Sequence, residues 1–545
     1  MGAFTPKLLT TWREGYTLAR LKDDALAGLT VAIVALPLAM ALGIASGAPP
    51  DKGLVTAIVA GFLISALGGS RVQIGGPTGA FVVIISGIIA THGYSGLMLA
   101  TMLAGLILIV AGYAGVGRLM KFIPTPVITG FTAGIAVIIA SSQIADFLGL
   151  NAEGIPADFL GKWAAYGQAI GTANLAALGI GIVALATILL LKRVAPRWPG
   201  YLIALALTSL AALALHLPVE TVGLRFPDMP TGLPAPRLPA FSMAMLGDVI
   251  GPAFTIAFLA GIEALLSATV ADGMTGYRHR SGQELVGQGA ANLASALFGG
   301  LPATGAIART ATNIRAGGKT PLAGIFHAAF LLLFLLIAGP LIAYIPMAAL
   351  AAVLLIVAWG MSEIDRFRAL MRLHVGERVL LLLTFALTVT VDLTVAIGVG
   401  VTLASLLFMA RMSEAAGLLP DEAVEEGEGE DPGQRATLPP GVEVFRLAGP
   451  LFFGAAGEML DALTRIGRTP DTVILRLGRV PYIDASGIMM LESFVRQARD
   501  AGTRVILCEL RAAVAVELQR ADPPFAGAET AGRFEQAIAM HGGRG

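Results

Sequence analysis

The sequence predicts an α-helical membrane protein that ends in a small cytoplasmic α/β domain, and three observations lead to this fold class. Only 14% of the 545 residues are charged and 56% are hydrophobic, whereas soluble proteins carry roughly 25% charged residues. Apolar segments follow one another from about residue 25 to residue 411. After an acidic stretch, short strand patterns then alternate with helix patterns, as in a small α/β domain.

We count fourteen apolar segments in the membrane part. A helix needs roughly 20 apolar residues to cross a bilayer, so the third and tenth segments are short once their Gly- and Pro-containing parts are removed. The segments cover residues 25–45, 54–69, 73–91, 95–116, 124–148, 170–191, 200–216, 245–271, 284–298, 302–315, 321–342, 346–360, 376–391 and 394–411. We therefore predict a transmembrane domain over residues 25–412.

Charged residues between the segments predict that both chain ends are cytoplasmic. Loops that follow even-numbered segments contain most of the Lys and Arg residues, and loops after odd-numbered segments contain only Lys52, Lys162, Arg225 and Arg237. Lys and Arg are enriched in cytoplasmic loops, so residues 1–24 form a predicted cytoplasmic lead-in.

A Pro-rich connection divides the membrane part into two halves. Six prolines lie within residues 217–241, between the seventh and eighth segments. Because seven is odd, the second half starts from the opposite face of the membrane. The sequence therefore predicts a seven-plus-seven inverted repeat.

Two Gly- and Pro-containing interruptions occupy related places in these halves. The first is Gly75–Phe81 and the second is Pro302–Ile307. Neither can continue a helix, and non-helical backbone at membrane depth must be covered by protein or line a cavity. We predict two half-helices, the first starting at Thr78 or beyond, whose N-termini face each other across an anion. The alternative is that these glycines only allow close helix packing.

Two charged residues inside apolar segments are candidates for function. Arg309 follows the second interruption and could add a full charge to an anion site, or could form a structural ion pair. Glu263 lies in the eighth segment, with Ser267 one turn later. A buried carboxylate pairs, binds a cation or takes up a proton, so Glu263 is the predicted coupling residue. A permanent Glu263–Arg309 salt bridge is the alternative.

The C-terminal part predicts a linker and one compact domain. Residues 413–441 are acidic and contain few apolar residues, which is typical of a flexible linker. Residues 442–545 predict strands at 442–447, 450–453, 472–477, 480–484 and 504–509, and helices near 455–466, 487–501 and 512–520. The balanced net charge gives no indication of a nucleic-acid partner, and the histidines show no metal spacing. We expect no metal, no cofactor and no enzymatic activity.

At this point the chain resembles the SulP family of anion transporters. The resemblance rests on Ala27–Ala32 with Leu36-Pro37, on the two interruptions, and on Asp484–Gly487, which is similar to the signature turn of a STAS domain. The family implies a core domain (segments 1–4 and 8–11), a gate domain (segments 5–7 and 12–14), elevator-like transport between them, and a homodimer.

The resemblance also implies the residues of a substrate site. Carried over by motif, the anion pocket contains Leu38, Leu42, Thr78, Ala308 and Arg309. The neighbouring residues of the two interruptions complete the predicted set, namely Gly76, Gly79, Ala80 and Ala306.

The coupling position of the family falls on Glu263. Sodium-dependent bicarbonate members place Asp there with Thr one turn later, so Glu263 with Ser267 is more similar to the proton-coupled members. Ser486 aligns with a serine that is phosphorylated in related STAS proteins, which makes it a regulatory candidate and leaves open a cytoplasmic protein that binds this domain. The alternative, which we favour, is that Ser486 caps the following helix.

Together these observations predict a secondary active anion transporter of the bacterial inner membrane. We expect proton-coupled import of sulfate or a C4-dicarboxylate. The alternatives are a sodium-coupled bicarbonate transporter, an uncoupled anion exchanger and a membrane-tethered anion sensor.

Overall fold

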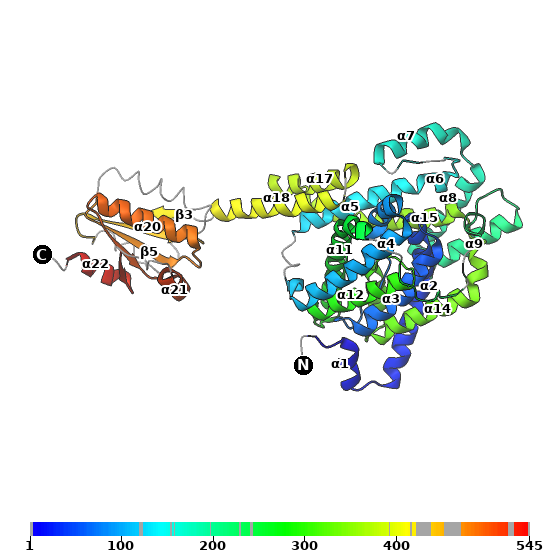
Figure 1. The fold of residues 1–545 in the computed structure, drawn as a ribbon, viewed down its shortest axis with the longest axis horizontal. Coiled ribbons are helices and arrows are strands. Elements are labelled where there is room, and N and C mark those ends of the chain that lie inside the picture. The colour runs from blue at the N-terminus through cyan, green and yellow to red at the C-terminus, as the bar shows by residue number, and fades with distance from the viewer. Residues whose placement is uncertain are drawn as a thin grey trace. The chain divides into compact units, whose positions relative to one another are not determined.

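The computed structural model divides the chain into two compact units, residues 1–401 and 402–545. The first is helical and the second contains a β-sheet (Figure 1). The structure describes residues 4–118, 124–152, 155–156, 158–196, 198–227, 230, 232–239, 243–391, 393–414, 417–420, 438–451, 470–520 and 528–542.

In the first half of the helical unit, the described residues form twelve helices of very different length and one short strand. In order they are α1 (Lys7–Arg13), α2 (Leu18–Ala45), α3 (Pro50–Leu67), β1 (Gly75–Gly76), η1 (Gly79–Phe81), α4 (Val82–Tyr113), η2 (Val116–Arg118), α5 (Thr125–Ser142), α6 (Ile144–Leu148), α7 (Phe159–Ala169), η4 (Ile170–Thr172), α8 (Leu175–Val194) and α9 (Gly200–Ala214). Proline helps to set two of the starts, because Pro50 and Pro126 lie in the first turns of α3 and α5, where no backbone donor is lost.

The second half follows a short helix, α10 (Val222–Arg225). Its elements are α11 (Met243–Thr275), α12 (Ser281–Leu297), β2 (Thr304–Gly305), α13 (Ile307–Arg315), α14 (Leu322–Ile342), α15 (Met347–Met361), α16 (Ile364–Leu370), α17 (Val375–Thr390) and α18 (Leu393–Glu414).

All fourteen predicted segments contain helix, but they differ in length. Within the described residues, nine helical stretches are long and apolar enough to cross a membrane. The helices α9, α12, α13 and α17 are shorter, with 15, 17, 9 and 16 residues. The third and fourth segments are continuous in α4, with a kink at Gly93, where φ is 66°. The chain is a multi-pass membrane protein, and the count of fourteen stays a prediction.

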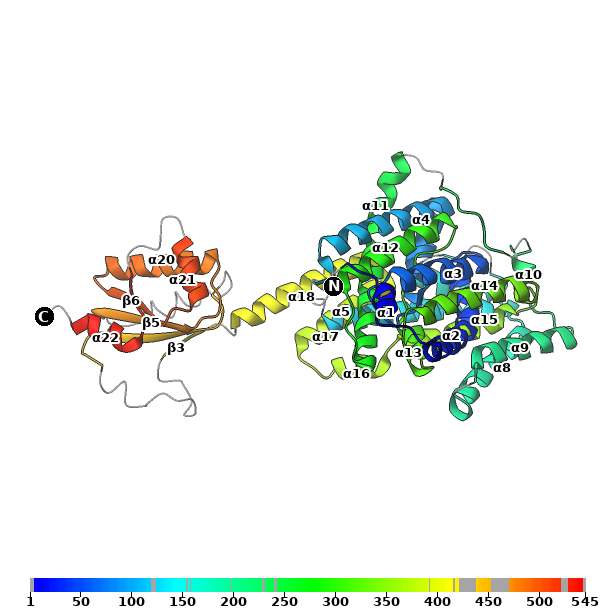
Figure 2. The same cartoon turned by 90° about the horizontal axis from the view of Figure 1, so that it is seen from below.

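The helices pack in two groups. In one, α4 packs against α11 and α12, and α14 packs against α2 and α3 (Figures 1 and 2). In the other, α5 packs against α15 and α17, and α8 against α9 and α15. The first group corresponds to the predicted core domain and the second to the predicted gate domain.

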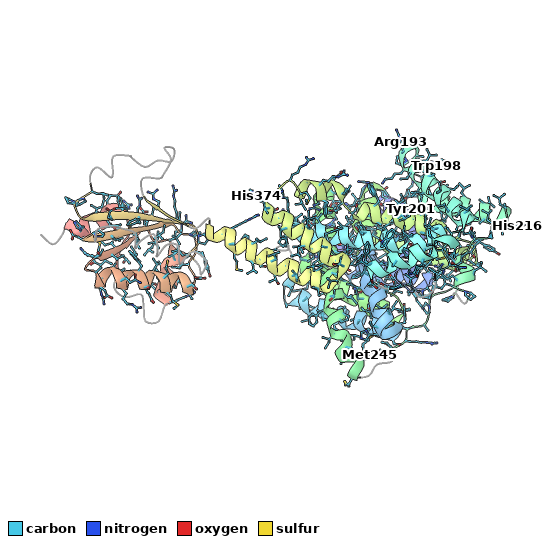
Figure 3. The ribbon with its side chains drawn as sticks, turned by 90° about the horizontal axis from the view of Figure 1, so that it is seen from above. Arg193, Trp198, Tyr201, His216, Met245 and His374 are labelled. Carbon is cyan, nitrogen blue, oxygen red and sulfur yellow. The ribbon has the colours of Figure 1, made fainter. Side chains whose placement is uncertain are left out.

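The two ends of the hairpin formed by α8 and α9 carry different residue types. Arg193 and Trp198 lie near the turn that joins the two helices, and His216 lies beyond the far end of α9 (Figure 3). Trp198 is 64% exposed, and Trp beside Arg is typical of the interface between a bilayer and water.

The C-terminal unit is a five-stranded sheet in the order β3-β4-β5-β6-β7. The strands are β3 (Gly417–Pro420), β4 (Val442–Ala448), β5 (Thr472–Arg479), β6 (Arg504–Cys508) and β7 (Glu529–Ala531). Only β3 is antiparallel to its neighbour. The helices α20 (Ala485–Asp500) and α21 (Ala512–Arg520) cover one face, and α22 (Phe534–Gly542) covers the other (Figure 2).

Three details of this unit differ from the sequence prediction. The strand β3 lies inside the predicted linker 413–441, so the sheet begins before the predicted boundary at residue 442. Of the predicted strands 450–453 and 480–484, the described residues form one bridge between Leu451 and Ile483, and residues 452–453 lie outside the described part of the chain. The predicted helix at 455–466 and most of the linker lie outside the described residues.

Candidate functional site

The two interruptions of the apolar segments meet. Gly75 pairs with Gly305 and Gly76 with Thr304, in an antiparallel two-stranded ladder. The Gln73 side chain packs directly on the second strand, because a Cβ at Gly305 would lie 1.5 Å from its Nε2 and 3.2 Å from the Cα of Ala264. Antiparallel strands from two halves of a chain are what an inverted repeat produces at its centre.

Polar side chains from neighbouring helices hold this ladder in place. On α12, the side chain of Asn292 accepts a hydrogen bond from the backbone N–H of Ala303 (2.9 Å) and donates to its carbonyl (2.8 Å). The Thr304 hydroxyl donates to the carbonyl of Ala260 on α11 (2.7 Å). Asn292 and Thr304 are fully buried, so the break is fixed by bonds that water does not weaken.

The first strand is held in the same way from the second half of the chain. The backbone N–H of Ile74 donates to the hydroxyl of Thr310 on α13 (3.0 Å), and the carbonyl of Ile74 accepts from the N–H of Ala306 (2.8 Å). Ser267 of α11 shares a hydrogen bond with Thr310 (3.2 Å). The sequence analysis missed Thr310 and left Asn292 unassigned, although buried polar residues in apolar helices are the pattern that identifies both.

Each strand leads directly into a helix. Thr78 is extended, with φ −126° and ψ 157°, and the short helix η1 follows it. Ala306 is also extended, and α13 follows it. Within the described residues, neither helix start is capped by the side chain of its own N-cap residue. The first amide groups of both helices are therefore left for another partner.

The side chains of Thr78 and Glu263 contact each other. The Thr78 hydroxyl donates to the Glu263 carboxylate (Oγ1 to Oε2, 2.9 Å), which joins the first break to α11. Both side chains are half-buried. Ser267 lies one turn further along α11, but its partner is Thr310.

Arg309 lies beside the first break and not beside Glu263. Its Nη2 donates to the carbonyl of Pro77 (3.0 Å), and a Cβ at Gly76 would lie 2.3 Å from its Nη1. The side chain is 2% exposed, and its Nε and Nη1 have no partner among the described residues. The Glu263–Arg309 salt bridge considered from the sequence is thus not formed between these two described side chains.

The small residues that the sequence assigns to the anion site differ in their exposure to solvent. Ala308 is exposed at the first turn of α13, whereas Ala80 and Ala306 are buried. Gly79 faces the other helix group, because a Cβ there would lie 2.5 Å from the sulfur of Met361 and 3.1 Å from Cδ1 of Ile139. The first break therefore lies where the two helix groups meet.

The two predicted leucines of α2 also differ. Leu38 is half-buried, and Leu42 is 2% exposed, with its carbonyl accepting a hydrogen bond from the Ser46 hydroxyl (2.7 Å). In this structure Leu42 is a residue of the hydrophobic core.

Ser486 does not cap α20, which corrects the alternative favoured from the sequence. The N-cap is Asp484, whose carboxylate accepts from the backbone N–H of Gly487 (2.8 Å). Asp484 is extended and lies three residues before Gly487, which suits an N-cap. Ser486 is then the second residue of the helix, and its role as a regulatory site stays a prediction.

Comparisons with known proteins agree with this architecture. The model of the sulfate permease family matches residues 21–384, and the model of the STAS domain matches residues 435–523. The chain belongs to the sulfate permease family. Its C-terminal unit contains a STAS domain.

Two relatives and one solved structure illustrate this family membership. The chain is 39% identical over 500 residues to "Putative sulfate transporter YvdB" of Bacillus subtilis, covering 91% of this chain and 93% of the relative. It is 34% identical over 519 residues to the bicarbonate transporter BicA of a Picosynechococcus strain, covering 89% and 88%. The structure of the murine anion transporter Slc26a9 has the same fold, with a TM-score of 0.87, 18% identity and 98% and 93% coverage.

Proposed function

We propose that this protein is a secondary active transporter that imports a small anion. The observation that supports this most directly is Arg309. Two nitrogens of its buried guanidinium, Nε and Nη1, have no hydrogen-bond partner among the described residues, and the side chain lies beside two helix starts that have no side-chain cap. A permanent charge with free donors, next to two helix N-termini, is suited to an anion.

The substrate we propose is sulfate or a C4-dicarboxylate. Arg309 offers a planar pair of donors, which matches two oxygens of a sulfate or carboxylate group. The similarity to a relative named as a sulfate transporter supports this choice. Ala308 is exposed at the first turn of α13, and its small side chain would not obstruct an anion at this helix start.

Glu263 is the proposed coupling residue. Its carboxylate accepts from Thr78, and a protonated Glu263 could still form this contact because the hydroxyl can also accept. Gain and loss of one proton would then change the charge beside the first break without removing the contact. Thr78 belongs to the break itself, so the coupling group and the anion site share a residue.

A sodium-coupled bicarbonate transporter is the second candidate. The Thr78 hydroxyl and the Glu263 carboxylate together supply oxygen ligands of the kind that hard cations prefer. The similarity to BicA, which is named as a bicarbonate transporter, favours testing this candidate directly.

We further infer an elevator mechanism in a homodimer of the bacterial inner membrane, with both chain ends in the cytoplasm. The contact of Gly79 with Met361 and Ile139 supports such a mechanism, because a site at the boundary of two helix groups is carried past one group when the other slides. Transport of this kind requires no enzymatic step.

The test is uptake of radiolabelled sulfate and succinate into proteoliposomes that contain the full chain. A proton gradient of one pH unit provides about 1.4 kcal/mol per proton, enough for roughly tenfold accumulation with one coupled proton. We expect Glu263→Gln to lose this accumulation while exchange of internal for external anion continues. Glu363→Gln is the control, because Glu363 is exposed and pairs with Arg366.

Each other result would identify a different function. Accumulation driven by sodium and not by protons would favour the second candidate. Exchange that ignores both gradients would indicate an uncoupled exchanger, and anion binding without any flux would indicate a sensor. Full proton-driven accumulation by Glu263→Gln would exclude Glu263 as the coupling group.

A further inference from the structure

The helix that follows the first break is covered at its start by a methionine from the other helix group. Gly79 is the first residue of the helical stretch Gly79–Tyr113, and it is buried. A Cβ at Gly79 would lie 2.5 Å from Sδ and 3.2 Å from Cε of Met361, and 3.1 Å from Cδ1 of Ile139. Met361 is the last residue of α15, and Ile139 belongs to α5. Two side chains of this group therefore pack on the residue at which the helix begins.

The two side chains lie on the side of the helix that carries its unbonded amide groups. Cα–Cβ bonds in a helix tilt toward its N-terminus, so atoms next to the Cβ position of Gly79 lie toward that end. The side chain of Thr78 does not cap these amides. The Nη1 of Arg309 lies at the same break, next to the Cβ position of Gly76, and has no partner among the described residues. An anion bound by these groups competes with the Met361 thioether for space.

The two covering side chains differ in their freedom to move. Ile139 is fully buried, and its branched Cβ restricts its χ1 rotamers. Met361 is only half-buried. Its side chain is unbranched, with three rotatable bonds, and methionine adapts readily to irregular gaps. Met361 can therefore leave the helix start by changing rotamer, whereas Ile139 is fixed by its neighbours.

The helix start at the second break is more open than the first. Ile307 is 40% exposed and Ala308 is exposed, both in the first turn of α13. At the first helix start, Gly79 and Ala80 are buried. The space available to an anion is therefore limited at the first helix start, where Met361 lies.

We propose that Met361 is a specificity-determining residue, whose side chain covers the first helix start and moves aside for the anion. This inference rests on the proposed function, because it requires an anion that binds between the two helix starts beside Arg309. The measured affinity of a site falls in proportion to the fraction of time for which it is open. A smaller residue at position 361 thus raises the affinity, and raises it most for a long anion, which needs the most space.

The first experiment measures KM and Vmax for sulfate and succinate uptake into proteoliposomes by the full chain, with Met361→Ala and Met361→Phe. We expect Met361→Ala to lower KM about tenfold for succinate, as for a site covered about nine-tenths of the time, and about threefold for sulfate. Met361→Phe should raise both KM values, and that of succinate more. A structural role alone would not shift the succinate-to-sulfate ratio of KM in opposite directions for a smaller and a larger side chain.

A matched control is Met371→Ala. Met371 is also half-buried, but it lies at the end of α16. We expect this variant to leave KM unchanged for both anions.

The second experiment does not require transport. The chain contains one cysteine, Cys508, which is buried in the STAS domain. Met361→Cys in a Cys508→Ser chain therefore provides a single thiol at the helix start. We expect sulfate and succinate to slow the modification of this thiol by a maleimide, because a bound anion blocks the approach of the reagent. Modification of Met371→Cys in the same background should not respond to either anion.

Failure of this inference can be distinguished from failure of the proposed function. If the chain takes up neither anion, or if Arg309→Ala leaves both KM values unchanged, the proposed function is wrong and the role of Met361 falls with it. If Arg309→Ala raises KM but the succinate-to-sulfate ratio is the same for Met361→Ala, Met361→Phe and the wild type, only the role of Met361 is overturned. Thiol modification at position 361 that neither anion slows, in a chain whose KM depends on Arg309, would also overturn it.

Discussion

Asn292 is the side chain on which the geometry of the second break depends most. Its amide makes three hydrogen bonds: it accepts from the N–H of Ala303 and donates to the carbonyls of Ala303 and Gln288. Asn292 and Ala303 are both fully buried. We predict that Asn292→Ala weakens both the stability of the protein and its transport.

The size of the effect follows from the groups that lose their partner. The variant leaves the N–H and the carbonyl of Ala303 without their side-chain bonds in a buried place, and each such loss costs roughly 1–3 kcal/mol. The expected destabilisation is therefore about 4 kcal/mol. Asn292→Asp should be at least as destabilising as Asn292→Ala, because its carboxylate keeps the bond from the Ala303 N–H but places a buried acceptor against the carbonyls of Ala303 and Gln288.

The assay combines thermal unfolding in detergent with anion uptake in liposomes. Asn292→Ala should unfold at lower temperature, and protein that remains folded should have a raised KM because the start of α13 is no longer fixed. Asn151→Ala is the control, since Asn151 is exposed. If Asn292→Ala retained both the unfolding temperature and the KM of the wild type, the amide would not be what positions the break.

Four further substitutions test three other contacts. Gly76→Ala should reduce uptake at least tenfold without preventing expression. The φ angle at Gly76 is +152°, and the new Cβ would collide with the Arg309 side chain. Normal uptake would show that the guanidinium can move aside. Asp24→Ala should destabilise the protein by about 2–4 kcal/mol in detergent unfolding. The buried carboxylate accepts from the backbone N–H groups of Lys319 and Thr320, just before α14, and from the hydroxyls of Thr320 and Tyr16. An unchanged unfolding midpoint would contradict this prediction. In the STAS domain, Asp484→Ala should cost about 1 kcal/mol and speed hydrogen exchange in the first turn of α20, whereas Ser486→Ala should have little effect; the reverse order would restore Ser486 as the cap.

Much of the helical unit follows from patterns that a sequence displays directly. Apolar segments of membrane length locate the helices, because every backbone polar group must be bonded inside the segment. The kink at Gly93 separates the third and fourth segments where the sequence predicts a boundary. The strand β3 was not predicted, because its partner β4 lies more than twenty residues further along the chain and an acidic stretch surrounds it.

The sequence likewise predicts some features of the candidate site and not others. Glycine and proline identify both breaks, and a charge inside an apolar segment identifies Arg309 and Glu263. The register of the ladder could not be predicted, because it is set through space by Asn292 and Thr310. The sequence predicts that the two helix starts face each other, but it does not predict that Thr304 pairs with Gly76 or that Thr78 contacts Glu263.

The register of the ladder also shows how unequal the two repeats are. A two-fold axis through the ladder places Gly75 on Thr304 and Gly76 on Gly305, an offset of 229 residues in both cases (304 − 75 and 305 − 76). By this offset the counterpart of Arg309 is Ala80. The cation of this pair of positions therefore comes from the second repeat alone, and its guanidinium reaches across to Gly76 and Pro77 of the first repeat.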